Sequence, residues 1–254
     1  MPFLRRPDGC RLYFEIHGPS DSEPIVLLEG LGGDIPGWRR NIPHLAAELR
    51  VVPFDFRGNG RSDPPEGPVT MTTFVEDTVA LLDRLKLEEA HLYGQSFGGM
   101  VAQELALTVP HRARSLILGC THPGVRHAVP VRSAVPKSRP WEALYSEAFL
   151  HDHPDEVAED LRSASPQAPG AARRQWEAMQ GFDSFDRLPS LRIPTLVLQG
   201  TEDRTIHPDN ARLLAERIPG SRLVLLEGAG HNYHVEQPDA ADEAVLGFVR
   251  GVGP

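Results

Sequence analysis

The sequence has few cysteines, few lysines and no long apolar run. Its 254 residues include two cysteines, Cys10 and Cys120, so at most one internal disulfide can form. Free thiols in a reducing compartment are the expected state. No run approaches the roughly 18 apolar residues that a membrane-spanning helix needs. The first ten residues carry two arginines without an apolar segment after them, unlike a secretory signal, and we expect a cytoplasmic protein.

The charge balance is acidic. There are 35 Asp and Glu residues against 26 Lys and Arg residues, a formal net charge of -9. This balance argues against nucleic acid or an anionic membrane as a partner, because both carry negative charge. Hydrophobic residues make up 40% of the chain and charged residues 24%, as in an ordinary globular protein. The length suits one α/β domain with room for an inserted subdomain.

Short apolar runs alternate with stretches of helical periodicity over most of the chain. Besides the run that precedes Ser96, the strands are expected at Ile25–Leu28, Val51–Phe54, Ser115–Cys120, Thr195–Gln199 and Arg222–Leu226. The helices are expected at Trp38–Leu49, Met71–Leu87, Met100–Val109, Pro208–Arg217 and Pro238–Arg250. An antiparallel hairpin of Phe3–Arg6 and Cys10–His17 should come first, since Pro7-Asp8-Gly9 reads as a turn. The alternation predicts a mostly parallel sheet covered by helices on both faces.

The pattern changes between residues 121 and 188. Prolines become frequent there, and the expected helices Trp141–Leu150, Pro154–Ser163 and Ala171–Met179 replace the strands. We therefore interpret residues 1–120 and 189–254 as one core, and residues 121–188 as a helical insertion within it.

The chain is organised around Ala90–Met100, which reads AHLYGQSFGGM and contains a G-x-S-x-G motif centred on Ser96. An apolar run precedes the motif and a helical run follows it. A strand, a sharp turn and a helix in this order are typical of a nucleophile elbow, which exposes the serine hydroxyl at the end of a strand. An ordinary tight turn is the alternative, because glycine and serine are common residues.

A serine hydroxyl needs a base to take its proton, and the base is usually a histidine oriented by a carboxylate. Asp203 follows the expected strand Thr195–Gln199, and His231 follows Arg222–Leu226. Ser96, Asp203 and His231 therefore occur in the order Ser, Asp, His, each at the end of a strand. Two neighbours remain as alternatives, Glu202 for the acid and His234 for the base.

With these residues the chain resembles the α/β-hydrolase superfamily over nearly its whole length. The matching segments are EGLGG, DFRGNGRSD, GQSFGG, GTEDRTIHP and GAGHNYHVEQPD. The resemblance implies Ser96 as nucleophile, His231 as general base and acid, and Asp203 as its orienting partner. It implies an oxyanion hole formed by the backbone N–H groups of Leu31 and Phe97, and identifies the insertion as a cap.

The resemblance also implies hydrolysis of a carboxylic ester or lactone through an acyl-enzyme, without a cofactor. Cleavage of a carbon–carbon bond, thioester hydrolysis, a non-hydrolytic reaction and simple ligand binding remain alternatives on the same fold. The expected partner is a small substrate that is apolar in part, and the sequence is compatible with a homodimer. His151-Asp152-His153 is more typical of a solvated loop than of a metal site, so no metal is expected.

Glu29 departs from the superfamily, which usually has a histidine before this glycine-rich loop. Enol-lactonases also lack that histidine, and their later histidine loop is similar to HNYHVEQP. We predict that Glu29 is ionised, held by an arginine or by backbone N–H groups, and turned away from the oxyanion hole. The aromatic residues Trp141, Phe149 and Trp176 of the insertion are candidates for the substrate pocket, with packing inside the insertion as the alternative.

Overall fold

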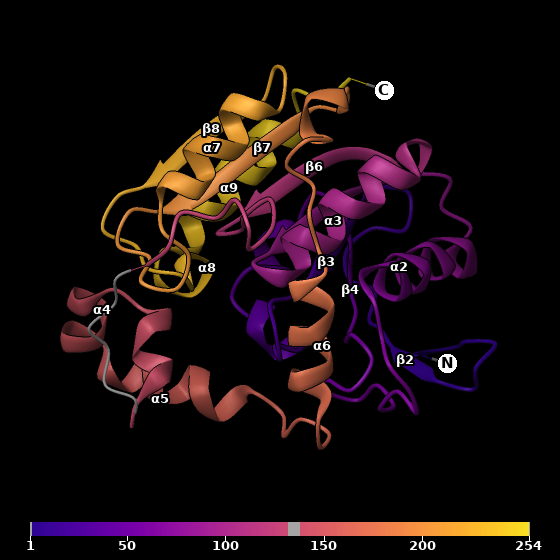
Figure 1. Ribbon diagram of the computed structural model, residues 1–254, viewed down its shortest axis with the longest axis horizontal. Helices are drawn as coiled ribbons and strands as arrows, with labels where there is room; N and C mark the ends of the chain where they lie inside the picture. Colours follow the sequence, from indigo (N-terminus) through magenta and orange to yellow (C-terminus); the bar gives the residue numbers. More distant parts are fainter. Residues whose placement is uncertain (1, 132–137, 254) are drawn as a thin grey trace.

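A computed structural model describes residues 2–131 and 138–253 of the chain. Its main sheet has six parallel strands in the order β4-β3-β5-β6-β7-β8 (Figure 1). The strands are β3 (Pro24–Leu28), β4 (Arg50–Pro53), β5 (Ala90–Gln95), β6 (Ala113–Gly119), β7 (Thr195–Gly200) and β8 (Arg222–Leu226). This arrangement confirms the predicted parallel sheet.

Helices cover both faces of the sheet because both faces of its strands are apolar. In β3, Val26 and Leu28 pack in one hydrophobic cluster, while Ile25 and Leu27 pack in another. The first cluster includes residues of α2 (Met71–Leu85), α3 (Phe97–Thr108) and α7 (Asp209–Arg217). The second includes residues of η1 (Ile35–Trp38), α1 (Ile42–Leu45), α8 (Tyr233–Glu236) and α9 (Pro238–Val249). Alternate residues of one strand thus face opposite helical layers.

The N-terminal hairpin forms as predicted but stays outside the main sheet. β1 (Phe3–Arg5) pairs antiparallel with β2 (Arg11–Tyr13). Gly9 closes the turn with a φ of 89°, a value that favours glycine. Both cysteines are free and buried, as expected. Within residues 2–131 and 138–253, no helix is both long and apolar enough to cross a membrane.

The helix expected over Trp38–Leu49 is wrong as a continuous element. The structure has η1, which ends at Trp38, and then the short α1 from Ile42 to Leu45. Pro43 explains the break. Proline lacks the N–H that a helix interior requires and is tolerated only in the first turn, where α1 places it.

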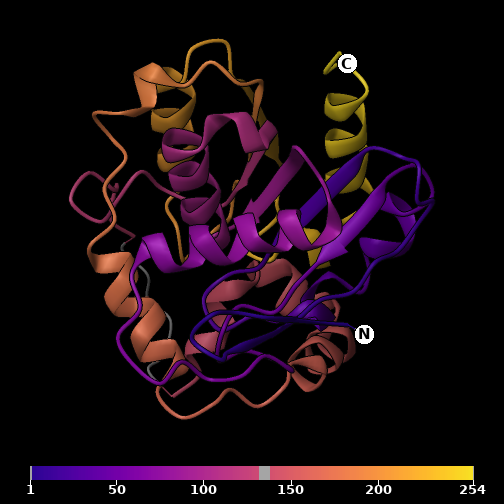
Figure 2. The same ribbon diagram turned by 90° about the vertical axis from the view of Figure 1, so that its right-hand side faces the viewer.

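The inserted segment, residues 121–188, contributes helices but no named strand over its described residues. These are η3 (Pro140–Leu144), α4 (Glu147–Asp152), α5 (Pro154–Ser163) and α6 (Ala171–Gln180). Of the remaining short helices, η2 (Pro110–Arg112) precedes β6, and η4 (Leu188–Ser190) begins at the last residue of the segment. The expected helix Trp141–Leu150 is divided: η3 ends at Leu144, Tyr145 is extended, and Ser146 caps α4 by accepting the Phe149 N–H. Figures 1 and 2 both place α4, α5 and α6 together on the side of the molecule away from the C-terminus.

Candidate functional site

Ser96 lies in the turn between β5 and α3, in a backbone conformation that non-glycine residues rarely adopt. Its φ is 53° and its ψ is −113°. Two hydrogen bonds hold this conformation: the Ser96 N–H donates to the Gly119 carbonyl at 2.8 Å, and the Thr121 hydroxyl donates to the Ser96 carbonyl at 2.7 Å. A strained residue that its surroundings hold in place is characteristic of functional sites.

The two glycines of the motif are needed for close packing. A Cβ atom at Gly94 would lie 2.3 Å from the Gly98 carbonyl oxygen, and one at Gly98 would lie 2.0 Å from the Leu28 carbonyl oxygen. Both distances are too short for any side chain. The G-x-S-x-G spacing therefore permits α3 to start directly against β3 and β5.

His231 and Asp203 are hydrogen-bonded to each other in the interior. His231 Nδ1 lies 2.8 Å from Asp203 Oδ2, and both residues are buried. The other carboxylate oxygen accepts the N–H groups of Thr205 and Ile206 at 2.7 Å and 2.8 Å. Gln199 Nε2 also donates to Asp203 Oδ2, at 3.0 Å. The carboxylate is thus fixed from four directions and orients the imidazole.

The neighbouring candidates lie in different surroundings. Glu202 is exposed, whereas Asp203 is buried. His234 is 2% exposed, and Trp38 lies beside it with ring centroids 5.0 Å apart. Burial lowers the pKa of His234 to about 4, so its imidazole is neutral at physiological pH. Only His231 of the two histidines carries the hydrogen bond to Asp203.

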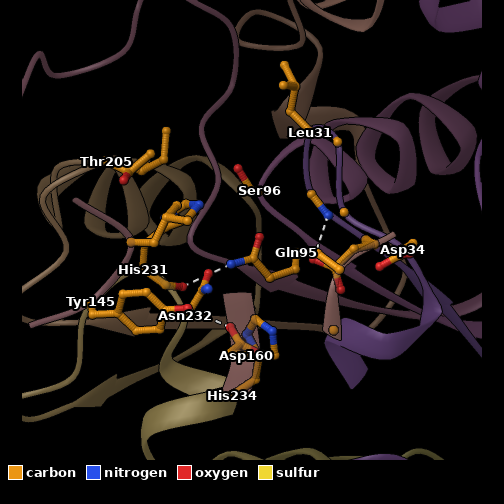
Figure 3. A pocket seen from close by; sticks show the side chains of 18 of the residues that line it. Leu31, Asp34, Gln95, Ser96, Tyr145, Asp160, Thr205, His231, Asn232 and His234 are labelled. Atoms are coloured by element: carbon orange, nitrogen blue, oxygen red, sulfur yellow. Dashed lines mark hydrogen bonds between the residues drawn. The ribbon is translucent and has the colours of Figure 1, made fainter. Parts of the chain in front are cut away.

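Ser96 and His231 share one cavity of about 550 Å³, a typical volume for a small-molecule site (Figure 3). Core loops and the inserted segment both line it. Its apolar lining comes from Leu31, Met100, Val125, Leu144, Leu161, Trp176, Met179 and Ile206. Its polar lining includes Glu29, Asp34, Gln95, Tyr145, Asp160, Asn232 and His234.

The glycine-rich loop after β3 approaches the serine closely. A Cβ at Gly30 would lie 3.4 Å from Ser96 Cβ, and the next residue, Leu31, lines the cavity. Phe97 is the first residue of α3, and N–H groups in the first turn of a helix have no acceptor within the helix. The Leu31 and Phe97 residues predicted for the oxyanion hole therefore flank Ser96 in space and in sequence, respectively.

The inserted segment braces this loop through residues that sequence reasoning missed. Gln175 of α6 accepts the Gly32 N–H at 2.9 Å and donates to Asn59 Oδ1 at 3.1 Å. Asn59 in turn donates to the Gly33 carbonyl at 2.7 Å. Gln175 is 1% exposed, although it follows two arginines in a polar-looking stretch. The signal in the sequence that could have indicated this role was a polar residue, Gln175, on the side of the helix that is otherwise apolar and buried.

The prediction for Glu29 is confirmed for the group that holds it and wrong for its charge. Its carboxyl Oε1 accepts the Gly30 N–H at 2.8 Å, as one of the predicted holders. However, burial, reinforced by the carboxylates of Asp160, Asp34 and Asp55, raises its pKa to about 8, so the group is mainly protonated at neutral pH. The holder is thus a backbone N–H group and not an arginine. The arginines of the loops that follow β3 and β4 bind other carboxylates, in the pairs Arg39–Asp160, Arg40–Glu156, Arg57–Asp77 and Arg61–Glu15.

The three aromatic residues predicted for the substrate pocket lie in different surroundings. Trp176 lines the cavity and is 53% exposed. Phe149 is buried in a cluster with Tyr145, Val157 and Val235, and Trp141 packs against that cluster. This placement corrects the expectation for Trp141 and Phe149, which pack the inserted segment instead of lining the cavity. Periodicity alone does not show which side of a short helix will be covered.

One group of potential metal ligands occurs among the described residues: Cys120, Asp203 and His231, whose ligand atoms lie within 4.8 Å of one another. Burial raises the pKa of the Cys120 thiol well above its usual range, which keeps it protonated. A protonated thiol is a poor metal ligand, and Asp203 and His231 already bind each other. The group therefore fits the predicted catalytic role better than a metal site.

Known proteins are similar to this chain in sequence and in overall fold. A protein of Azorhizobium caulinodans named as carbamate hydrolase RutD is 32% identical, with 98% of each chain covered. The enol-lactonase of Burkholderia xenovorans is 27% identical with a TM-score of 0.88, covering 98% of this chain and 100% of its own. An esterase of Thermogutta terrifontis is 28% identical with a TM-score of 0.85, covering 100% and 98%.

The sequence pattern that describes the alpha/beta hydrolase fold matches residues 23–238. This range includes the Ser96 turn, the Asp203 loop and the His231 loop. It also includes the whole inserted segment, so the match does not depend on the core alone. The chain therefore belongs to the α/β-hydrolase family.

Proposed function

We propose that this α/β-hydrolase cleaves a small carboxylic ester or lactone with Ser96 as nucleophile. The observation that carries the proposal is the convergence of a strained serine and a buried His231–Asp203 pair on one cavity. Family membership alone leaves the reaction open, because one fold hosts many activities. A nucleophile with an oriented base beside it is the arrangement that acyl transfer requires.

The proposed reaction begins with attack of Ser96 Oγ on the carbonyl carbon, while His231 Nε2 takes the hydroxyl proton. Asp203 accepts the Nδ1–H of His231 and so leaves Nε2 free to act as base. The N–H groups of Phe97 and Leu31 stabilise the negative charge on the carbonyl oxygen. The alcohol then leaves with the proton from His231. A water molecule, deprotonated by the same histidine, hydrolyses the acyl-enzyme and releases the acid.

The inserted segment acts in this proposal as a cap that selects the substrate. Its residues Val125, Leu144, Leu161, Trp176 and Met179 provide much of the apolar cavity lining. A substrate that is apolar in part would bury this surface on binding. The names of the similar proteins, which include an enol-lactonase and an esterase, agree with this substrate class.

Hydrolysis of a carbamate is a second candidate. It is favoured by the relative named as carbamate hydrolase, which matches along 98% of the chain. The same serine, histidine and N–H groups would serve, because a carbamate also presents a carbonyl carbon to the nucleophile. The two candidates differ only in the atom that flanks this carbonyl group.

The test compares purified wild type with Ser96→Ala on nitrophenyl acetate, nitrophenyl butanoate, a simple lactone and a nitrophenyl carbamate. We expect turnover of at least one of these by the wild type and a loss on the order of 10⁴-fold or more in the variant. Thermal unfolding at the wild-type temperature would show that the variant is folded. Equal activity of the two proteins would contradict the proposal.

A further inference from the structure

Besides the Ser96–His231 pair, the cavity has a second polar region, which consists of Glu29, Asp34, Asp160 and His234. In Figure 3, Gln95 and Asn232 lie between Ser96 and His231 at one end and Asp160 and His234 at the other. A hydrogen bond fixes the Gln95 side chain in this intermediate position, because Gln95 Nε2 donates to the His231 carbonyl at 2.9 Å. The far region takes no part in the reaction proposed above, yet it lines the same cavity.

Two buried polar atoms in this region lack a partner. Among the described residues, neither Glu29 Oε2 nor His234 Nδ1 has a hydrogen-bond partner. The two residues are 8% and 2% exposed, respectively, and both line the cavity. An unpaired buried polar group loses its hydrogen bonds to water without replacement, so such groups are uncommon in folded proteins. Both atoms belong to residues that line the same cavity, where a ligand group that reached them would supply the missing hydrogen bonds.

Two carboxylates complete the region and are built into it. Asp34 is 3% exposed and accepts the Ser165 N–H at 2.9 Å. Asp160 accepts the Tyr145 hydroxyl at 2.6 Å and pairs with Arg39. The Ser165–Asp34 and Arg39–Asp160 contacts join the core to the inserted segment, and with the Tyr145 hydroxyl they hold the carboxylates at the cavity wall. The side chains are therefore preorganised and do not need to gather around a ligand.

The charges of the region decide which ligand it suits. Arg39 is engaged by Asp160, and His234 is neutral because burial lowers its pKa to about 4. Glu29 holds its proton because burial and the nearby carboxylates raise its pKa to about 8. A ligand carboxylate would meet other carboxyl groups there without a free cation among the lining residues. A carboxamide or hydroxyl group can donate to the carboxylates and also accept the Glu29 O–H, whereas an ammonium group has no acceptor and would leave that proton without a partner.

We propose that Glu29, Asp34, Asp160 and His234 form a subsite that binds a neutral hydrogen-bond-donating group of the substrate, such as a terminal carboxamide or hydroxyl, and rejects a carboxylate. The inference rests on the proposed function, because it assigns the subsite to the substrate that Ser96 attacks. It sharpens the substrate class from a partly apolar ester to one with a polar, uncharged end.

Nitrophenyl esters of four-, six- and eight-carbon acids test the subsite, each acid ending in a methyl, carboxamide, ammonium or carboxylate group. Nitrophenyl acetate, which is too short to reach the subsite, serves as the reference within each variant. At the best chain length, we expect kcat/KM for the carboxamide to exceed that of the methyl ester about 10-fold, and that of the carboxylate about 100-fold or more. A preference for the carboxylate or the ammonium ester would overturn the proposal.

Variants assign the preference to these residues. His234→Phe keeps the ring but removes its nitrogens, and Glu29→Leu removes the carboxyl group, so both should reduce the carboxamide-to-methyl ratio to about 1. Glu29→Gln stays neutral and should keep most of the ratio. Glu76→Gln, a change at an exposed carboxylate of α2 outside the cavity lining, is the control and should keep it fully. A ratio that survives both His234→Phe and Glu29→Leu would contradict the subsite.

Binding separates failure of the subsite from failure of the proposed function. If the wild type hydrolyses no ester, including the acetate, the reaction assignment is wrong, but calorimetry with Ser96→Ala still tests the subsite. Hexanamide should then bind at least about 10-fold more tightly than hexanoate at about pH 7, and His234→Phe should remove the difference. Equal binding of the two compounds would overturn the proposal even if the wild type is an active esterase.

Discussion

The core loops and the inserted segment meet at one cavity but are held in place by different kinds of contact. On the core side, Asp203 and His231 are fixed by hydrogen bonds within loops that directly follow β7 and β8. On the other side, α5 and α6 reach the core through long-range pairs such as Arg39–Asp160 and the Gln175–Gly32 hydrogen bond. Local loops thus position the residues of the proposed chemistry, while long-range contacts shape the part of the cavity that we propose selects the substrate.

The comparison predicts that core changes reduce the rate on every substrate alike. Asp203→Asn should lower kcat by roughly 10³- to 10⁴-fold, because the amide favours the wrong tautomer of His231. The loss should be equal for short and long esters. Glu202→Gln is the matched control, since the neighbouring carboxylate is exposed, and should stay near the wild-type rate. A larger loss in Glu202→Gln than in Asp203→Asn would show that Glu202, and not Asp203, orients His231.

Glu29 provides a test on stability instead of rate. Its pKa is raised to about 8 from an ordinary 4.5, so the folded protein holds a proton that the unfolded chain releases. Stability from this group is fully present below the ordinary pKa and is lost as pH rises toward 8 and beyond. We expect the free energy of unfolding to fall by about 2–3 kcal/mol from this group between about pH 6 and pH 8.

Glu29→Gln should flatten this part of the pH dependence, as measured by urea unfolding at several pH values. Asp242, whose pKa burial raises to about 7, and Asp55, raised to about 6, contribute in the same direction and remain in the variant. The pH dependence of the free energy of unfolding that remains in Glu29→Gln should therefore come from Asp242 and Asp55. An unchanged slope in Glu29→Gln would mean that Glu29 is ionised in the folded protein, as the sequence alone led us to expect.

Gln175 links the two regions and should have an intermediate effect. Gln175→Ala removes the hydrogen bonds to Gly32 and Asn59, which should loosen the loop that carries the Leu31 N–H. We expect kcat to fall by about 10-fold with little change in substrate preference, because the oxyanion donors act on every substrate. Arg173→Ala, on the same helix with an exposed side chain, is the control. A change in KM alone would place Gln175 in substrate binding.

Trp176 should show the smallest and most selective effect. Trp176→Ala removes apolar lining on the segment side, so kcat/KM for an eight-carbon ester should fall a few-fold relative to the acetate. Trp141→Ala provides the contrast, because Trp141 packs outside the cavity lining. That variant should lose stability without a change in chain-length preference. Equal losses on short and long esters in Trp176→Ala would contradict the distinction between core residues, which affect every substrate, and residues of the inserted segment, which set the substrate preference.

The same division explains which features could be predicted from the sequence. The positions of Ser96, Asp203 and His231 were predictable, because each belongs to a short motif at the end of an apolar strand. The bracing by Gln175 was not, since it depends on where α6 docks, 143 residues from its partner Gly32. The protonation of Glu29 also escaped, because burial depends on the complete fold. Only the break at Pro43 was readable but overlooked.

The central claim is that Ser96 is the covalent nucleophile of the core, and labelling tests it most directly. A fluorophosphonate should inactivate the wild type and add one phosphonyl group, which peptide mass mapping should place on Ser96. Ser96→Ala should remain unlabelled under the same conditions. Rapid inactivation with the label on another residue, or full ester turnover by a protein whose Ser96 carries the phosphonyl group, would contradict the account.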